Sequence, residues 1–215
     1  LSGLVGSEMC IRDRGYLVLL SLAVLLFANR FGVRGIGIGV VVVIATAALL
    51  YGASDKFGER IDSIASEYRS WDPATRATTS TGQRLEFYTN TAKIIAAHPL
   101  IGVGTGGLPA AYEKIVEGTP IPPSRNPHSD FLGFAVQWGV IGLAALIAYL
   151  VVLWRASRYI TDDLHRLIAR GLVLTMVVGC AFNSLLLDHT EGLFFAWLTG
   201  LLYAGVQSPP VGKQY

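Results

Sequence analysis

Five apolar runs, separated by polar and charged stretches, constrain this chain more than any other feature of its sequence. The runs cover residues 16–28, 36–51, 131–154, 172–187 and 193–206. A bilayer core about 30 Å thick needs roughly 20 helical residues, with about 17 as the usual lower limit. The third run meets this length outright, the second, fourth and fifth meet it with flanking Gly, Ser and Thr, and the first is short. The pattern predicts an all-α integral membrane protein with about five transmembrane helices, near residues 16–33, 34–52, 129–155, 168–187 and 191–207.

The charge distribution favours membrane helices over the alternative, a set of buried helices in a large soluble protein. Of the 215 residues, 52% are hydrophobic and 15% are charged, whereas soluble domains carry roughly 25% charged residues. Nearly all of this charge lies between the runs. The net charge of +2 implies no polyanionic partner, so nucleic acid is not expected. Two cysteines, Cys10 and Cys180, cannot build a disulfide framework.

A polar block at residues 53–128 separates the second run from the third. It is too long for a hairpin loop, and we expect it to form short helices over one mouth of the membrane domain. Within it, residues 84–97 predict an amphipathic helix, because four side chains follow the i, i+3, i+4 rule: Leu85, Tyr88, Ala92 and Ile95. His98-Pro99 should end this helix, since proline cannot continue its hydrogen-bond ladder.

The short loops predict the orientation of the chain. The loop after the first run carries two basic residues and no acidic one, Arg30 and Arg34. The loop after the third run carries an excess of basic residues: Arg155, Arg158, Arg166 and Arg170. The turn between the fourth and fifth runs carries Asp188 and Glu191 and no Lys or Arg. By the positive-inside rule, the basic loops and the tail 208–215 are cytoplasmic, and the block 53–128 is external.

Residues 1–14 (LSGLVGSEMCIRDR) fit nothing downstream. They show no signal-peptide pattern and they resemble a translated sequencing-adapter read. We expect this stretch to be an assembly artefact, followed by two transmembrane helices in 15–52 and three in 129–207. The chain would then be the C-terminal part of a larger membrane protein, whose upstream helices would be its partners.

Functional side chains gather at the outer boundary of the last three runs. His128 and Asp130 stand where the third run begins, and antiparallel neighbours would bring to the same depth three residues of the next turn: Asp188, His189 and Glu191. Arg84 and Arg125 belong to the same external block. The set offers a base, carboxylates that orient it, and cations for an anionic ligand. Purely structural roles stay open for two of these residues, since Asp130 could cap a helix and Arg84 could be a solvated helix start.

A glycine-dense stretch, GVGTGG at 102–107, has two interpretations. Its backbone N–H groups could cradle a phosphate, although it lacks the Lys and Ser/Thr of a P-loop. Alternatively it is a tight turn at the membrane surface. No spacing of His, Cys, Asp or Glu suggests a metal site convincingly, so no metal or cofactor is expected.

Two segments carry a resemblance to a known family: RLEFYTNTAKIIAAHPLIGVGTGG (84–107) and NPHSDFLGFAVQWGVIGLAALIAYL (126–150). With the ending NSLLLDHTEGLFFAWLTGLLYA (183–204), they resemble the O-antigen ligase family, which also contains O-antigen polymerases and protein O-oligosaccharyltransferases. In that family an Arg opens an amphipathic helix that ends in His-Pro and a Gly-Val-Gly turn. An Asn-Pro-His then precedes a long transmembrane helix with a Gly-Leu-Ile-Gly-like sequence. The matching positions here are Arg84, His98-Pro99, 102–104, 126–128 and 139–142.

The resemblance implies a membrane-embedded glycosyltransferase of a bacterial inner membrane. Such an enzyme moves a glycan from undecaprenyl pyrophosphate to an acceptor hydroxyl, the lipid A-core for ligases, without a metal or other cofactor. It implies that His128 is the base or orienting group and that Arg84 holds the pyrophosphate, with Arg125, Asn126 and Asp130 near the substrate. A polymerase of the same superfamily is the alternative. A transporter fragment would predict charges within the runs, which are absent, and a non-catalytic anchor would leave His128 and Arg84 without a role.

Overall fold

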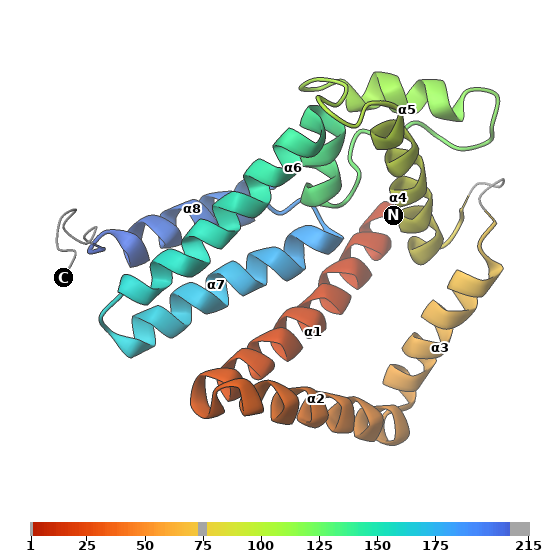
Figure 1. Ribbon diagram of the computed structural model, residues 1–215. Helices are drawn as coiled ribbons and strands as arrows, with labels where there is room; N and C mark the ends of the chain where they lie inside the picture. The colour runs from red at the N-terminus through yellow and green to blue at the C-terminus, as the bar shows by residue number, and fades with distance from the viewer. Residues whose placement is uncertain (1, 73–76, 207–215) are drawn as a thin grey trace.

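The protein is helical throughout the part that the structure describes. This structure, a computed structural model, describes residues 2–72 and 77–206, with side chains from Gly15 onward except that of Ser80. The helices are α1 (Ser2–Phe31), α2 (Val33–Ala53), α3 (Asp55–Ser70), α4 (Ser80–Ala97), α5 (Leu108–Val116), α6 (Asp130–Ala156), the short 3-10 helix η1 (Ser157–Tyr159), α7 (Asp163–Phe182) and α8 (His189–Tyr203). The all-α membrane class predicted from the apolar runs is confirmed (Figure 1).

Three of the described helices are long and apolar enough to cross a bilayer. They are α2, the stretch Asp130–Tyr159 that joins α6 to η1, and α7. The apolar part of α1, Gly15–Phe31, is shorter, and the 15 residues of α8 extend only about 22 Å at 1.5 Å per residue. The expected count of five spans therefore stays a prediction for these two helices. α7 also ends at Phe182 rather than near residue 187, because Asn183 caps it in an extended conformation.

The main core lies between α6, α7 and α8 (Figure 1). It consists of one apolar stripe from each helix: Leu146, Leu150 and Leu153; Leu172, Val173, Met176 and Cys180; and Phe195 with its neighbours, joined by Leu185 of the loop before α8. α1 packs on α7, where a Cβ on Gly171 would lie 3.3 Å from the Leu22 side chain. The packing of α1, α6 and α8 on α7 fixes the positions of the loops at the two ends of α7.

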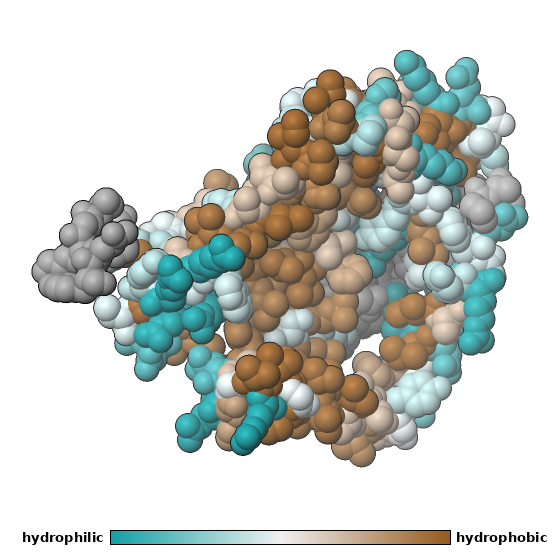
Figure 2. Space-filling model, in the orientation of Figure 1, coloured by the Kyte–Doolittle hydropathy of each residue, from teal (hydrophilic) through white to brown (hydrophobic). Residues whose placement is uncertain are grey.

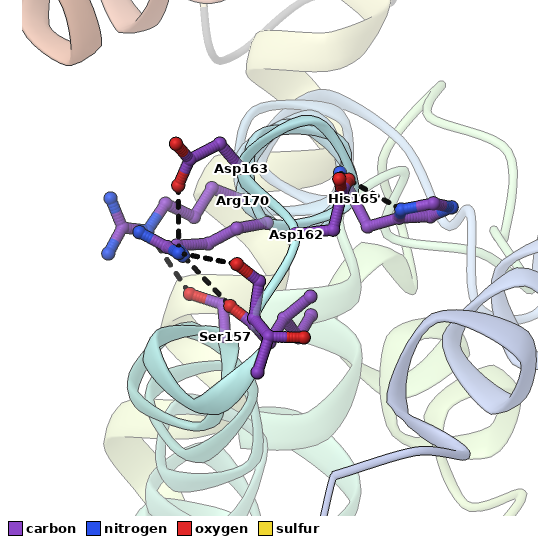
Figure 3. Close-up of polar contacts among 8 residues, drawn as sticks. Ser157, Asp162, Asp163, His165 and Arg170 are labelled. Carbon is purple, nitrogen blue, oxygen red and sulfur yellow. Dashed lines mark hydrogen bonds and ion pairs between the residues drawn. The ribbon is translucent and has the colours of Figure 1, made fainter.

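The connection from α6 to α7 is held by contacts between residues that lie within or next to it in the sequence (Figure 3). The Asp162 carboxylate caps α7, accepting from the His165 backbone N–H at 2.7 Å and lying 2.6 Å from the His165 ring nitrogen. These hydrogen bonds lower the pKa of Asp162. Arg170 donates from Nε to the Ser157 hydroxyl at 3.1 Å, with its guanidinium over the Trp154 ring.

Both basic connections lie at the same end of the molecule, the α1–α2 turn and the α6–α7 connection (Figure 1). Figure 2 shows hydrophilic surface over both of them, separated from the opposite end by a hydrophobic band. Arg30, Arg34, Arg155 and Arg158 are all exposed there. The arrangement is the one that a shared cytoplasmic face requires.

The polar block contains α3, α4 and α5, as short helices were expected. A second core joins α4 and α5 to α6 through Ile94, Leu108, Tyr112, Val116, Ile121 and Val136. The stripe predicted for α4 is displaced from the most buried face. Leu85, Tyr88 and Ile95 are partly buried and Ala92 is exposed, whereas the buried face runs through Glu86, Asn90 and Ile94. Glu86 and Asn90 can be buried because both are paired: Glu86 accepts from the Ala77 backbone N–H at 3.0 Å, and Asn90 donates to the Tyr112 hydroxyl at 3.3 Å.

α6 is not the straight helix that the third run predicts. Gly139, inside it, has φ +63° and ψ −153°. A Cβ on Gly142 would lie 2.9 Å from the carbonyl oxygen of Phe134, whereas eight residues of straight helix separate two positions by about 12 Å. The chain therefore doubles back at Gly139, and residues 130–138 pack beside the start of residues 140–156. Hydropathy does not register the reversal because both limbs are apolar.

Candidate functional site

His128 occupies a strained backbone position directly before α6. Its φ of +53° lies in the left-handed region, where it is the only non-glycine residue among those described. The Asn126 side chain supports this conformation, because its Oδ1 accepts from the His128 backbone N–H at 2.8 Å. Non-glycine residues in this region cost free energy and persist where the surroundings hold them, often at functional sites.

α4 holds the His128 residue from one side. The imidazole stacks on the Phe87 ring, with centroids 5.0 Å apart and planes 26° from parallel. The Tyr88 hydroxyl donates to the His128 backbone carbonyl at 3.3 Å. Ring orientation and backbone conformation are thus both set by a helix 40 positions earlier in the chain.

Arg84 lies on the same face of α4 as Phe87 and Tyr88, because positions i, i+3 and i+4 are neighbours on a helix. It is partly buried. The helix begins at Ser80 and is capped by Thr79, whose hydroxyl accepts from the Gly82 backbone N–H at 3.1 Å. The sequence-based start at Arg84 was wrong, so this cation stands one turn inside the helix, next to the residues that hold His128.

The first turn of α4 is anchored on α3 by Glu67. Its carboxylate accepts from the Thr81 backbone N–H at 3.2 Å and from the Ser63 hydroxyl at 3.0 Å. Partial burial raises the pKa of Glu67, but the hydrogen bonds from Thr81 and Ser63 outweigh it, and the pKa lies below its ordinary value. An anionic carboxylate at a helix N-terminus also suits the helix dipole, so Glu67 helps to fix the helix that carries Arg84.

The segment around His128 is joined to the end of α7 by four hydrogen bonds. Two come from side chains: the Ser184 hydroxyl donates to Asn126 Oδ1 at 2.7 Å, and the Ser129 hydroxyl donates to the Cys180 carbonyl at 3.0 Å. Two involve Asp130, which donates from its backbone N–H to the Asn183 carbonyl at 3.2 Å and accepts on Oδ2 from the Leu186 backbone N–H at 3.0 Å. Asn126 Oδ1 therefore accepts two hydrogen bonds, from His128 and from Ser184.

Asn126 and Asp130 consequently have partners within the protein. Asp130 has no exposed surface, and Asn126 is partly buried with its oxygen already engaged. Side chains in these positions can fix the loop on which His128 lies.

The other predicted site residues are exposed. Arg125 lies beside the Asn126 turn, and Asp188, His189 and Glu191 lie at the start of α8. The residues that contact the 126–130 segment are those just before this turn, from Cys180 to Leu186. The structure thus brings Arg84, His128 and Asp130 into one junction of α4, α6 and the α7–α8 loop, and it leaves the acidic turn at the edge of that junction.

The glycine-dense turn is a docking element for α6. Val103 and Gly104 donate from their backbone N–H groups to the Val136 and Gln137 carbonyls, both at 2.9 Å, and Gly106 donates to the Gln137 side chain at 3.1 Å. In return, Val140 donates from its backbone N–H to the Pro99 carbonyl at 2.8 Å. The N–H groups that would cradle a phosphate are occupied by the reversal of α6, so the tight-turn interpretation is the one that holds.

Two features of the described residues complete the picture. A shallow groove of about 270 Å³ runs between α6 and α7, and its lining is apolar apart from Arg155: Phe131, Ile147, Leu150, Val151, Trp154, Val173 and Val177. It begins next to Asp130, at Phe131. In the same described residues, no three His, Cys, Asp or Glu side chains come together as a metal site would require.

Sequence reasoning missed Phe87 and Ser184 as parts of this junction. Phe87 lies three positions after Arg84, so the helical period of the 84–97 segment could have indicated that it faces the same way. Ser184 follows Asn183 where the fourth run becomes polar. Nothing local in the sequence pairs it with Asn126, which lies 58 positions away.

A family model described as O-antigen ligase matches residues 14–147, which is more than half of the chain. The matched region contains α4, His128 and the reversal of α6, and it ends before the residues of the α7–α8 loop that complete the junction. No curated protein matches the chain. The length of the family match shows that this chain belongs to the O-antigen ligase family.

Proposed function

We propose that this protein transfers a glycan from undecaprenyl pyrophosphate to the hydroxyl of a lipid A-core acceptor, at the external face of a bacterial inner membrane. Membership of the O-antigen ligase family supports a lipid-linked glycan substrate. The observation that carries the proposal is the strained His128, stacked on the helix that presents Arg84. This pair offers a base and a permanent cation from two segments that the fold brings together.

In the proposed reaction the acceptor oxygen attacks the anomeric carbon of the lipid-linked sugar. The bond between that carbon and the pyrophosphate oxygen breaks, and its electron pair leaves with the pyrophosphate. The acceptor hydroxyl loses its proton to a ring nitrogen of His128, which neutral imidazole can accept. Arg84 stabilises the charge that develops on the pyrophosphate, since guanidinium is always charged and presents paired donors.

Asn126, Asp130 and Ser184 are positioning residues in this proposal. They connect the loop that carries His128 to the end of α7, so the imidazole keeps one place relative to the bundle. Arg125 and the exposed turn of Asp188, His189 and Glu191 lie where an incoming glycan would pass. Their expected contribution is substrate binding.

The proposed topology places the basic connections in the cytoplasm and residues 53–128 outside, above helices in 15–52 and 129–207. The shared end of the two basic connections supports this orientation (Figure 2). The His128 junction lies at the opposite end of α7. In this topology it faces the external side of the membrane, where the proposed transfer takes place.

The test is transfer of the cell's own lipid-linked glycan by the full-length protein carrying His128→Asn. Asn adopts the left-handed backbone conformation readily, so this change removes the base without disturbing the turn. We expect transfer to be lost, whereas His98→Ala, which alters an exposed histidine of the same block, should transfer normally. Full activity of His128→Asn would overturn the assignment. Supplying either lipid A-core or a second lipid-linked glycan as acceptor distinguishes a ligase from a polymerase.

A further inference from the structure

An exposed apolar tip stands at the end of the molecule where α6 reverses. It joins two segments that are distant in sequence, the turn at Leu100 and Ile101 and the reversal at Val140 and Ile141, with Trp138 beside them. The first four side chains are between 53% and 73% exposed. They are adjacent because Val140 donates to the Pro99 carbonyl, and because a Cβ on Gly139 would lie 2.3 Å from Leu100.

The tip is continuous with the surface that α6 presents to the bilayer. No charged residue interrupts 131–154, and Ile147, Val151 and Val152 continue the exposed apolar face along the helix. Figure 2 shows this hydrophobic surface reaching the upper end of α6, with hydrophilic groups beginning over α5. The Trp138 indole donates its N–H to the Thr105 hydroxyl at 3.0 Å, an amphipathic arrangement that suits tryptophan near a membrane interface.

Helix lengths show how far the bilayer must extend. Arg155 and the Arg170–Ser157 pair mark the polar end of the bundle. From Trp154 back to Val140, α6 rises about 21 Å at 1.5 Å per residue. An apolar core about 30 Å thick therefore continues roughly 9 Å beyond Val140, so the turn of Leu100 and Ile101, which contacts Val140 and Gly139 directly, falls within it.

We propose that this tip is embedded in the outer leaflet of the membrane and that its partner is the acyl chains and interfacial region of outer-leaflet lipids. The turn 99–104 is then part of the membrane domain, although it lies within the block expected to be external. Residues 130–138 climb about 12 Å from Asp130 to Trp138. The His128 junction consequently lies below the external surface of this membrane, at the depth of the lipid molecules.

Depth-dependent quenching tests this placement. The full-length protein carries Ile101→Cys labelled with an environment-sensitive fluorophore (NBD), in a background that keeps the buried Cys180 and has serine at every other native cysteine. It is reconstituted in phosphatidylcholine–phosphatidylglycerol vesicles with nitroxides on either the headgroup or the acyl chain. We expect blue-shifted emission, quenched more strongly by acyl-chain than by headgroup nitroxides. Glu113→Cys on exposed α5 should show the reverse order, and Val152→Cys on α6 serves as the lipid-facing reference.

Two results would overturn the proposal. Emission at position 101 that matches position 113 would place the tip in water, and emission that no nitroxide quenches would mean that a protein segment covers it. Leu100→Cys repeats the measurement at a second side chain, 68% exposed, so a local effect of one label does not decide the outcome. Depth is measured without turnover, so the result is independent of the proposed transfer reaction.

Discussion

A histidine lies near each end of α7, and the two histidines are held in opposite ways. At the α6–α7 connection, His165 pairs with Asp162 three positions away, and both are more than half exposed. At the other end, His128 is held by Phe87, Tyr88 and Asn126, and Asn126 is held by Ser184, 58 positions away. A pair of exposed groups that are close in sequence, such as Asp162 and His165, needs only a helix terminus to form. Convergence of distant segments on one strained residue requires the whole fold, and it indicates where function should be sought.

The largest expected effect separates the two histidines. His128→Asn should lower the transfer rate by about 10²–10⁴-fold, the usual contribution of a general base. His165→Asn should leave the rate unchanged, because its contacts end at the Asp162 cap. Rates are compared with purified full-length protein in vesicles. Equal losses in both variants would erase the distinction between the two ends.

The arginines give the next effect. Arg84→Lys should reduce transfer about ten- to hundredfold, since a lost charge-assisted hydrogen bond is worth about 1.5–3 kcal/mol. Arg158→Lys, in the exposed basic connection, should be neutral. The loss should appear in kcat more than in KM if the second donor matters mainly as pyrophosphate departs. An unimpaired Arg84→Lys enzyme would leave only a charge requirement at this position.

Two buried serines provide a matched pair for positioning. Ser184→Ala and Ser157→Ala each remove a hydroxyl with a side-chain partner, Asn126 and Arg170 respectively. Both should lower stability by about 1 kcal/mol, the typical net worth of a hydrogen bond. Only Ser184→Ala should also lower kcat, and Ser184→Thr should restore part of it. Thermal unfolding and kinetics on the same samples separate the two contributions, and an equal kcat in both variants would argue against positioning.

The smallest expected effect concerns acid. The pKa of Glu67 and that of Asp162 are both below their ordinary values, so each group favours folding above its unfolded pKa and this contribution disappears as pH falls through the folded pKa. Glu67→Gln and Asp162→Asn should therefore unfold at lower temperature than the unaltered protein at pH 7. The difference should shrink only below the ordinary carboxyl pKa of about 4, as pH falls through the lowered folded pKa of each group. Near pH 7, only Glu67→Gln should weaken transfer, because it loosens the helix that carries Arg84. A difference in melting temperature that persists in acid would assign the stabilisation to packing.

The sequence predicted the helical class, the end of α4 at His98 and the short helices of the polar block, because periodicity and proline act locally. His128 and Arg84 were predicted from their place in the external block and from the resemblance, and they remain predictions as site residues. In the structure Phe87 stacks on His128 and follows Arg84 by three positions on α4. The stripe on α4 was misplaced because Glu86 and Asn90 are buried with partners that hydropathy cannot anticipate. The reversal of α6 was missed because it depends on the backbone angles of Gly139 and on the close approach of Gly142 to Phe134.

That reversal bears on how the chain is made. Insertion machinery responds to the summed hydrophobicity of a segment, and the 27 residues of α6 are apolar enough to partition as one continuous span. The mature hairpin needs Val136 and Gln137 to exchange helical hydrogen bonds for those of Val103 and Gly104. The partners of the reversal are synthesised before the segment that reverses, so they are already present when α6 leaves the ribosome. Biogenesis can then proceed in chain order, with the earlier turn acting as the template on which the later helix bends.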